Sequence, residues 1–327
     1  MAKYSVILPV RNGGKYVQEC IQSILHQTLP DLNLLVLDNC SSDGTLEYVR
    51  SLHDERIEIY PAESPLSIEE NWGRIKSIHK NEFMTMIGHD DLLHHDYLKE
   101  IDLLMQKHPK ASLYHTHFRY IDAEGKFVRS CLPMCETQQA HEFIACQMNR
   151  TIDSTGTGYV MRSNDFDLLG GMPTHYPNLI FSDYELWVKL MLRGYKATSF
   201  EESFSYRLHL SVSKMTNGMM YQQAFGFYME FLKKLMKDNL LIKQAVHRYG
   251  KDMLLYFCES LSHRLLKTPT RERTLSVSDF IEKCKAYAKE MIPGQEFKPT
   301  DKFRIRIAKQ LDSSFVGRGL FNLYKRL

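Results

Sequence analysis

The chain has 327 residues, of which 43% are hydrophobic and 25% charged, and its formal net charge is +3. This length suits one large α/β domain with a smaller appendage, and the composition excludes disorder along the whole chain. So small a net charge gives no indication of a nucleic-acid partner. No run of about 18 apolar residues occurs, so no transmembrane helix is expected. Because the N-terminus lacks the features of a secretory signal, we expect a cytoplasmic protein.

Seven cysteines are scattered through the chain, an odd number that does not indicate a disulfide framework in a reducing compartment. Cys131 and Cys135 form the only closely spaced pair. A zinc site would need a second pair of ligands nearby, and none is visible, so zinc is not expected.

The first 107 residues alternate between short apolar runs and amphipathic stretches. Four runs rich in β-branched and apolar residues predict buried strands at 4–10, 32–38, 57–60 and 83–87. Apolar residues at helical spacing predict a helix after each strand, and Ser67 with Glu70 forms a candidate capping box for one of them. This alternation predicts a mainly parallel sheet with helices on both faces.

Carboxylates follow two of these predicted strands. Asp38 closes the strand at 32–38, and Asp90 and Asp91 come directly after the strand at 83–87. Because parallel crossovers are right-handed, the carboxyl ends of the strands share one edge of the sheet, where ligands of open α/β sheets bind. We therefore expect Asp38 and Asp90 to face a common crevice.

The second half of the chain is less regular. Strands are predicted at 111–122, 126–130, 155–162 and 195–200, and helices at 139–149, 163–169 and 183–193. From about residue 217 onward the pattern is helical only, which predicts a separate C-terminal region.

The tandem carboxylates Asp90 and Asp91 are suited to a hard divalent cation, Mg²⁺ or Mn²⁺, that could bridge a diphosphate. The alternative is that they cap a helix predicted at 92–106. No glycine-rich phosphate loop follows the first strand, so a diphosphate would be held by the metal and by basic side chains.

Five segments, taken in order, resemble the motifs of family-2 glycosyltransferases, which are inverting enzymes of the GT-A fold. Residues 5–45 contain SVILPVRN, SILHQT and LDNCSSDGT, and later segments read NWGR at 71–74, MIGHDD at 86–91, SDYELW at 182–187 and YRLH at 206–209. The resemblance covers roughly residues 4–213.

The resemblance implies a fold and an activity. The fold is a Rossmann-like, mainly parallel sheet flanked by helices, with a catalytic domain at 1–215 and a helical region at 216–327. Within the catalytic domain, the donor half is expected at about 1–110 and the acceptor half at about 111–215. The activity is transfer of a hexosyl or N-acetylhexosaminyl group from a nucleotide-diphosphate sugar, with uridine as the default base. The acceptor is a glycan or lipid-linked glycan of cell-surface polysaccharide or lipopolysaccharide, and Mn²⁺ or Mg²⁺ is the expected cofactor.

The resemblance also implies donor-binding roles. Pro9, Arg11 and Asp38 match positions that line the base and the ribose, and Arg74 matches a position near the diphosphate. From the residues alone, Asp38 could instead cap the turn that follows it, and Arg74 could be a solvated helix residue. Arg11 stands where Tyr or Thr is frequent, and Asn39 replaces the second aspartate of a common Asp-Asp pair.

Metal-binding roles are implied for a second group. Asp90 matches the metal-coordinating aspartate and Asp91 its neighbour, while His209 matches a position that touches metal or diphosphate in some relatives. A surface histidine is the alternative for His209. Gly88 replaces the first acidic residue of the usual D-x-D motif.

The catalytic base implied by the resemblance is Asp183. It would deprotonate the acceptor hydroxyl, which attacks the anomeric carbon opposite the departing diphosphate. The alternative is that Asp183 is the N-cap of a helix at 184–193. Ser182 stands in place of the glutamate that commonly precedes this aspartate.

The C-terminal segment 302–327 is basic and partly amphipathic, with Phe315 and the leucines 320, 323 and 327 interspersed with Arg318, Lys325 and Arg326. Such a helix could lie on an anionic membrane surface, which would place the enzyme at the inner face of a membrane. It could equally pack on the catalytic domain or on a second subunit of a homo-oligomer.

Two other functions remain open. The first is a sugar-nucleotide nucleotidyltransferase, although residues 11–15 resemble its basic, glycine-rich loop only faintly. The second is a catalytically silent nucleotide- or glycan-binding module. This alternative stays open because Gly88, Asn39 and Ser182 depart from the usual motifs.

Overall fold

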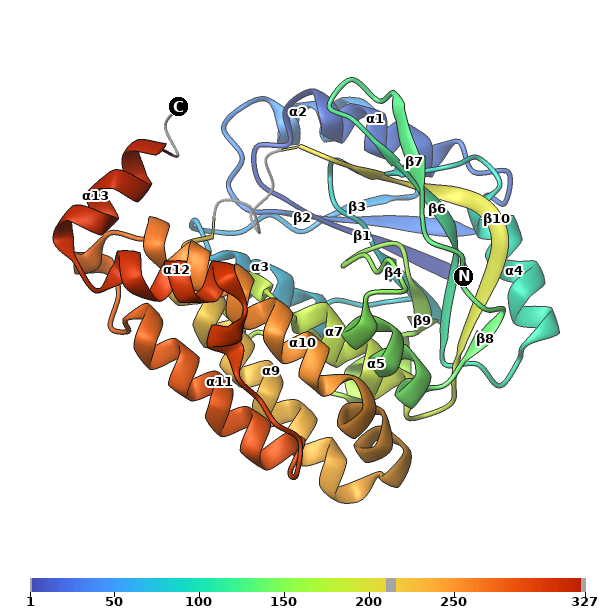
Figure 1. Ribbon diagram of the computed structural model, residues 1–327. Helices are drawn as coiled ribbons and strands as arrows, with labels where there is room; N and C mark the ends of the chain where they lie inside the picture. The colour runs from blue at the N-terminus through green and yellow to red at the C-terminus, as the bar shows by residue number, and fades with distance from the viewer. Residues whose placement is uncertain (1, 210–215, 325–327) are drawn as a thin grey trace. The chain divides into compact units, whose positions relative to one another are not determined.

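A computed structural model describes residues 2–209 and 216–324, without the side chains of residues 320, 322 and 324 (Figure 1). The chain divides into two compact units. The first unit comprises residues 1–143, 152–175 and 182–211, and the second comprises residues 144–151, 176–181 and 212–327.

The first unit is built on one sheet, which has ten strands within the described residues. Its main path runs in the order β3-β2-β1-β4-β9-β6-β10-β5, with β7 pairing β6 and β8 pairing β10. The strands are β1 (Tyr4–Val10), β2 (Leu32–Asp38), β3 (Ile57–Ile59), β4 (Phe83–Met86), β5 (Leu92–Leu93), β6 (Leu113–Ile121), β7 (Phe127–Ser130), β8 (Thr137–Gln138), β9 (Val160–Arg162) and β10 (Lys196–Arg207).

The N-terminal half of the sheet is parallel, as the alternating pattern predicts. β1 pairs in parallel with β2 on one side and β4 on the other, and β2 pairs in parallel with β3. Beyond β4 the sheet becomes mixed, because β9 runs antiparallel to both β4 and β6 while β6 and β10 are parallel. Every residue of β1 is buried, so the strand is covered on both faces.

Helices pack on this sheet through the apolar faces that the sequence predicts. Val17, Cys20, Ile21 and Ile24 of α1 belong to one core cluster with alternate residues of β1 and β2. The capping box of Ser67 and Glu70 is present at the start of α3. The unit's helices are α1 (Gly14–Leu25), α2 (Thr45–Ser51), α3 (Ile68–Gly73), η1 (Arg74–Ser77), α4 (Tyr97–Lys107), α6 (Ser163–Leu168) and α7 (Ser182–Met191), and α5 (Ala140–Asn149) passes from this unit into the second.

The predicted helix at 92–106 is wrong at its start. Leu92 and Leu93 form β5, which pairs antiparallel with Ser205 and Phe204 of β10, and α4 begins only at Tyr97. Asp90 and Asp91 therefore do not cap this helix, because five residues separate Asp91 from its first turn. A two-residue strand is specified by a partner far along the chain, which local pattern does not reveal.

The predicted strand at 155–162 is also too long, since β9 contains only residues 160–162. Gly158 has a φ of +76°, which strands do not tolerate, and a Cβ atom there would meet the Phe204 ring at 3.0 Å. Residues 155–158 are consequently a loop beneath β10, and this loop contributes to the site described below.

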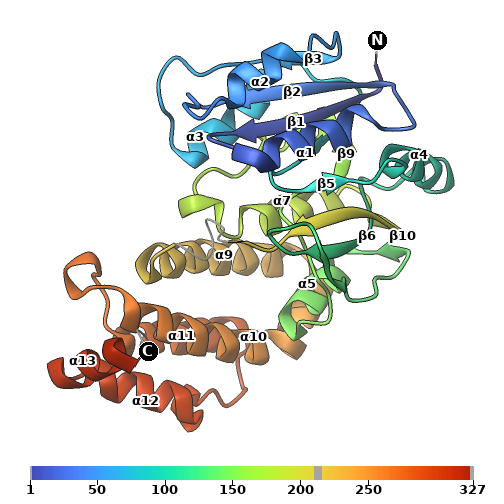
Figure 2. The same cartoon turned by 90° about the horizontal axis from the view of Figure 1, so that it is seen from above.

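The second unit is helical. It contains η2 (Pro177–Leu179), α9 (Gly218–Asp238), α10 (Leu240–Lys267), η3 (Thr270–Glu272), α11 (Val277–Met291), η4 (Pro299–Asp301), α12 (Phe303–Asp312) and α13 (Phe315–Tyr324). Within this unit α10 packs against α9, α11 and α12 (Figure 2). Asn239 caps α10 through its side chain, and a fully buried pair of Arg273 and Asp312 at 2.5 Å ties the start of α11 to the end of α12. Among the described helices, none combines the length and apolar character needed to cross a membrane.

Candidate active site

The loops that follow β1 and β2 are joined at the carboxyl edge of the parallel strands. The register places Val10 beside Asp38, the last residues of the two strands. The Ser42 backbone N–H donates to Asn12 Oδ1 at 2.8 Å, and the Gly14 backbone N–H donates to Asp43 Oδ2 at 2.8 Å. This edge therefore has a rigid rim of backbone and short polar side chains.

Asp38 is buried at this rim, with 1% of its surface exposed. Its Oδ2 accepts from the Ser41 N–H at 3.2 Å, so one oxygen does cap the following turn. Its Oδ1 is buried and has no hydrogen-bond partner among the described residues. A buried carboxylate oxygen left without a donor is costly, and a ligand N–H or O–H at this position would satisfy it.

Arg74 is held beside Asp38 and is not a solvated helix residue. Its Nη1 donates to the Asp38 carbonyl at 3.3 Å, and its Nη2 donates to the Tyr60 carbonyl at 2.6 Å. The guanidinium is half-buried, and the resulting desolvation lowers the pKa of Arg74 even though Asp38 opposes this. A fixed positive charge therefore lies at the edge of the sheet next to Asp38.

The other two residues expected at the base and ribose differ in exposure. Pro9 is buried within β1 opposite Leu37, one residue before the end of the strand. Arg11 is exposed directly after the strand. The structure thus brings Pro9, Asp38 and Arg74 together, while the Arg11 side chain faces solvent.

Asn39 explains one departure from the common pattern. Its Nδ2 donates to the Leu66 carbonyl at 2.9 Å, and its Oδ1 accepts from the Leu66 N–H at 2.7 Å. An aspartate could make only the second bond, because an ionised carboxylate cannot donate. Asn39 therefore holds the segment before α3 against the donor edge.

Asp90 and His209 form a direct ion pair across 119 positions of sequence, between Asp90 Oδ2 and His209 Nε2. About a fifth of each side chain is exposed, 22% for Asp90 and 21% for His209. The Tyr16 ring lies 5.3 Å from the imidazole, centroid to centroid. His209 of the YRLH motif thus contacts Asp90 of the MIGHDD motif at a partly exposed site.

Asp91 points into the protein. Its Oδ1 accepts from the Arg207 backbone N–H at 3.0 Å, and its Oδ2 accepts from the Thr157 hydroxyl at 2.8 Å. Burial, followed by the neighbouring Asp90 charge, raises the pKa of the Asp91 carboxyl well above its usual range. This arrangement favours a role in holding β10 and the 155–158 loop over a role as a metal ligand.

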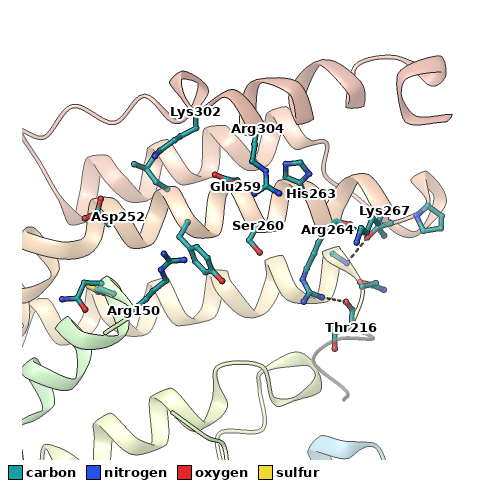
Figure 3. A pocket seen from close by; sticks show the side chains of 18 residues that line it. Arg150, Thr216, Asp252, Glu259, Ser260, His263, Arg264, Lys267, Lys302 and Arg304 are labelled. Atoms are coloured by element: carbon teal, nitrogen blue, oxygen red, sulfur yellow. Dashed lines mark hydrogen bonds and ion pairs between the residues drawn. The ribbon is translucent and has the colours of Figure 1, made fainter. Parts of the chain in front are cut away.

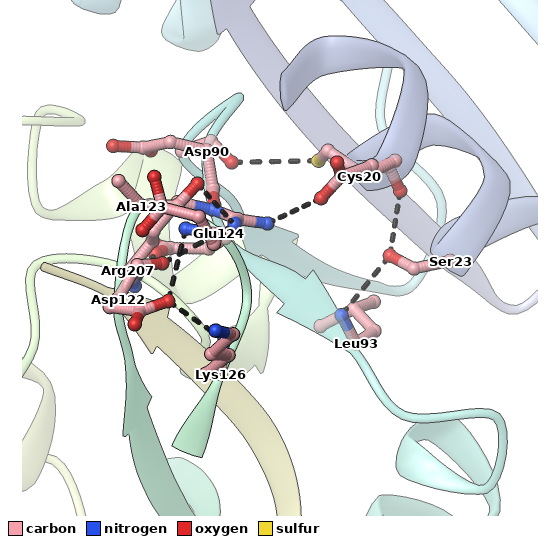
Figure 4. Close-up of polar contacts among 12 residues, drawn as sticks. Cys20, Ser23, Asp90, Leu93, Asp122, Ala123, Glu124, Lys126 and Arg207 are labelled. Carbon is pink, nitrogen blue, oxygen red and sulfur yellow. Dashed lines mark hydrogen bonds and ion pairs between the residues drawn. The ribbon is translucent and has the colours of Figure 1, made fainter. Parts of the chain in front are cut away.

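Arg207 holds the backbone around Asp90 in place (Figure 4). Its Nε donates to the Asp90 carbonyl at 2.8 Å, and its Nη1 lies 3.4 Å from the carbonyls of Asp122 and Ala123. Its Nη2 pairs with Glu19 at 2.6 Å, although the Arg207 side chain is only 1% exposed. Arg207 belongs to the YRLH motif, but the sequence predicts no role for it, because nothing in the local sequence shows that an arginine will be buried.

Asp183 lies in the first turn of α7, which begins at Ser182, so it is not the N-cap that the sequence allowed. A Cβ atom added to Gly156 would lie 3.6 Å from Asp183 Oδ2, which shows how closely the loop approaches the carboxylate. The half-buried side chain lies in a setting where desolvation raises the pKa of Asp183 to about 6. Such a value suits a general base near neutral pH.

The 155–158 loop connects Asp183 to Asp91. Gly156 abuts Asp183, the next residue, Thr157, donates to Asp91, and the Trp187 indole of α7 donates to the Thr155 carbonyl at 3.1 Å. The pKa of Tyr206 is raised by burial and then by Asp91, Asp90 and Asp183 together. Carboxylates from two distant segments, residues 90–91 and residue 183, are therefore close enough to act on one phenol.

The donor set fits a divalent cation only in part. Among the described residues no group of three or more His, Cys, Asp or Glu side chains is arranged to hold a metal ion. Asp90 and His209 supply one carboxylate and one imidazole, which suit Mn²⁺. A Cβ atom at Gly88 would lie 2.6 Å from Asp90 Oδ1 and 3.2 Å from Asp91 Oδ2, so an acidic residue at position 88 would require the Asp90 carboxylate to shift.

A parallel sheet edge that carries acidic side chains at its carboxyl end is the arrangement expected for a glycosyltransferase, and comparison with known families agrees. The family model described as glycosyl transferase family 2 matches residues 5–169. The chain therefore belongs to glycosyl transferase family 2 and is a glycosyltransferase, which confirms the family that the motifs predict.

Relatives extend this result. An uncharacterised glycosyltransferase of Rickettsia typhi is 23% identical over 268 residues, covering 77% of this chain and 79% of the relative. TuaG of Bacillus subtilis, named as a putative teichuronic acid biosynthesis glycosyltransferase, is 24% identical over 218 residues, covering 62% of this chain and 78% of TuaG.

Solved structures confirm the predicted fold. Staphylococcus aureus TarS 1–349 in complex with UDP-GlcNAc superposes with a TM-score of 0.68 at 15% identity, covering 99% of this chain and 91% of that one. A mannosyltransferase of Pyrobaculum calidifontis in complex with GDP-Man and Mn²⁺ gives a TM-score of 0.52 at 15% identity, covering 100% and 88%. The chain thus has the GT-A fold, with a sheet that is mixed as a whole.

Proposed function

We propose that this enzyme transfers a hexosyl or N-acetylhexosaminyl group, with inversion, from a UDP-sugar to a glycan or lipid-linked glycan of the cell surface. The observation that carries the proposal is the link from Asp183 through Gly156 and Thr157 to Asp91, beside the pair of Asp90 and His209. A similar fold bound to UDP-GlcNAc in TarS and the name of TuaG support the donor and the polymer class. In this proposal residues 1–110 hold the donor and 111–215 the acceptor.

Asp183 is the proposed base. Its carboxylate takes the proton of the acceptor hydroxyl while that oxygen forms a bond to the anomeric carbon. The bond from this carbon to the diphosphate oxygen breaks on the opposite face, and the nucleotide diphosphate leaves. A folded-state pKa of about 6 keeps Asp183 ionised at neutral pH yet basic enough to accept the proton.

Asp38 and Arg74 are proposed to hold the nucleotide. The unpartnered Oδ1 of Asp38 would accept from a base N–H or a ribose hydroxyl, and the fixed guanidinium of Arg74 would face the diphosphate. Pro9 would form the floor beneath the base, and Arg11 would reach the nucleotide from the solvent side.

Asp90 and His209 would hold Mn²⁺ or Mg²⁺, and the bound ion would offset the charge that develops on the diphosphate. In this arrangement Asp91 keeps Asp90 in place by anchoring β10.

Nucleotide-sugar turnover tests the donor assignment. With UDP-GlcNAc, UDP-glucose and GDP-mannose offered separately with Mn²⁺, release of UDP is expected to exceed release of GDP. Asp38→Asn is expected to weaken UDP binding about tenfold or more, because a hydrogen bond to a charged group contributes roughly 1.5–3 kcal/mol. Binding is measured by thermal shift with UDP.

Asp238→Asn is the matched control, because Asp238 is exposed at the end of α9 in the second unit. Its UDP affinity should equal that of the wild type. Formation of a nucleoside triphosphate from UDP-sugar and pyrophosphate, without release of UDP, would instead establish a nucleotidyltransferase.

An anionic membrane is the proposed site of action, because the end of the second unit carries exposed apolar side chains near cations. Phe303, Phe315 and Val316 are 68%, 87% and 70% exposed, and Arg306 and Lys309 are exposed on α12. Apolar and basic groups together suit an anionic lipid surface. Lys325, Arg326 and Leu327, which contribute to the predicted pattern, lie outside the described residues, and so does the side chain of residue 320.

Co-sedimentation with vesicles tests this surface. The double variant Phe315→Ser/Val316→Ser is expected to lose most of its binding to vesicles that contain phosphatidylglycerol, because about 0.8 kcal/mol is lost per CH₂ group no longer buried in lipid. Leu103→Ser is the control, because Leu103 is 50% exposed on α4 of the first unit. Equal sedimentation of the double variant and the wild type, or a wild-type dimer that the double variant abolishes, would reject membrane contact.

A further inference from the structure

A cavity of about 1060 Å³ lies within the helical second unit, and none of the residues proposed for catalysis lines it (Figure 3). Three separate segments line it: residues 148–150 at the end of α5, residues 252–269 of α10 and its C-terminal turn, and residues 302–304 at the start of α12. Asn217 and Gly218 at the start of α9 complete the wall. The volume slightly exceeds the usual range for small-molecule sites, which is about 300–1,000 Å³.

Cations outnumber carboxylates in this wall. The carboxylates are Asp252 and Glu259, and the cations are Arg150, Arg264, Lys267, Lys302 and Arg304, an excess of three over the same lining residues. Glu259 pairs with Arg304 across the cavity wall at 2.9 Å. Lys267 and Lys302 are exposed, and within the described part of the chain neither has a carboxylate within 4.0 Å.

Two of the guanidinium groups are fixed in place by aromatic rings. Arg150 lies 4.5 Å from the centroid of the Tyr256 ring, and Arg264 lies 4.4 Å from that of Tyr221. Arg264 also donates to the Thr216 carbonyl at 3.2 Å. Stacking on a ring fixes the plane and the position of the guanidinium charge. Figure 3 shows these groups on different walls, so they do not converge on one point.

The lining also offers neutral hydrogen-bonding groups between the cations. Asn149 and Asn217 provide amide N–H groups, because their Oδ1 atoms already accept from Thr151 and Met220. Ser260 adds a hydroxyl group and Tyr256 an aromatic ring. Hydroxyl-rich chains are recognised by such mixtures of polar groups and rings. A small inorganic ion would use only one or two of these groups, and would leave most of the cavity empty.

We propose that this cavity binds an anionic, hydroxyl-rich glycan chain, with its repeating phosphate or carboxylate groups on the dispersed cations. That this chain is the acceptor of the transfer rests on the proposed function, but the binding itself does not. Single-stranded nucleic acid is less suited, because it requires several exposed stacking faces along a more strongly basic groove.

Calorimetric titration of the full-length protein tests the proposal. Three probes are used in about 50 mM salt: a short polyol-phosphate oligomer, an oligogalacturonate, and an uncharged cello-oligosaccharide of the same length. At least one anionic probe is expected to bind, and the uncharged one is not. Binding to the phosphate probe alone, or to the carboxylate probe alone, identifies the anion.

Charge reversal at the two exposed lysines locates the site. Lys267→Glu and Lys302→Glu are each expected to weaken binding about threefold, and the double variant about tenfold, since each exposed ionic contact contributes roughly 0.2–1 kcal/mol. Lys289→Glu on α11 carries the same change at an exposed position outside the cavity and should leave affinity within error. Melting curves of all variants establish that they are folded, and Lys→Gln substitutions replace any that is not.

Several outcomes overturn the proposal. These are absence of binding to both anionic probes, equal weakening by Lys289→Glu, tighter binding of a hexauridylate than of either glycan, or lysine-dependent binding to phosphatidylglycerol vesicles only. Release of UDP from UDP-sugar without acceptor is measured in parallel. If UDP is released but no glycan binds, only the cavity proposal is rejected. If a glycan binds but no UDP is released, only the proposed function is rejected.

Discussion

Replacing Asp183 by asparagine is expected to abolish sugar transfer and at the same time to raise the melting temperature at neutral pH. Loss of a general base typically lowers turnover about 10²–10⁴-fold. The same carboxylate is ionised at a cost, because burial raises the pKa of Asp183 from 3.8 to about 6. A pKa shift of this size lowers the free energy of unfolding by about 3 kcal/mol at most. Removing the charge removes that cost.

The sign of the pH dependence follows from the raised value. Between the unfolded pKa of about 3.8 and the folded pKa of about 6, the native state binds more protons than the unfolded state. Stability therefore falls as pH rises through this window, and the full cost is present above it. The difference in melting temperature between Asp183→Asn and wild type should be largest above pH 6 and should vanish below about pH 4.

Turnover at saturating donor and acceptor is measured from pH 5 to 8 alongside calorimetric melting. Wild-type activity should rise through about pH 6 as the base ionises. Asp183→Glu is the control, because it keeps a carboxylate while displacing it from Gly156. An active Asp183→Asn enzyme, or a variant that is less stable than wild type at pH 8, would remove Asp183 as the base.

Replacing Arg207 by methionine should destabilise the first unit by about 1–3 kcal/mol, the usual cost of leaving polar groups without their donor, since Glu19 is half-exposed and can be solvated. The substitution removes the donors to the Asp90 carbonyl and to Glu19, and leaves backbone carbonyls of Asp122 and Ala123 without this partner. Transfer should fall as well, because Asp90 is held through its own carbonyl.

Urea unfolding and steady-state turnover measure the two effects, and Arg207→Lys separates charge from shape. Lysine keeps the positive charge near Glu19 but cannot donate from a planar fork, so we expect intermediate stability and a larger loss in turnover than in donor affinity. If Arg207→Met were as stable as wild type, the network around Asp90 would be incidental.

Local sequence determined much of the first unit. The strands at 4–10 and 32–38 agree with the structure residue for residue, because fully buried parallel strands consist of continuous apolar runs. The start of α3 could also be predicted, because the capping box of Ser67 and Glu70 involves only residues that are close in sequence. The helical C-terminal region from about 217 follows from its uninterrupted helical periodicity.

Tertiary structure decided what depends on partners far along the chain. β5 exists because residues 92 and 93 pair with β10, and the 155–158 loop is shaped by Phe204. Because β10 and Phe204 are far along the chain from these segments, a local sequence pattern cannot predict either contact.

The same holds for the site. The sequence placed carboxylates at strand ends, but it could not show that Asp91 turns inward to Thr157 and Arg207 while Asp90 stays partly exposed beside His209. Two adjacent residues of the same type differ only in what surrounds them, and burial and pKa are properties of those surroundings. Composition and periodicity determine the long buried strands and the amphipathic helices, and packing over long sequence distances determines which carboxylate can do chemistry.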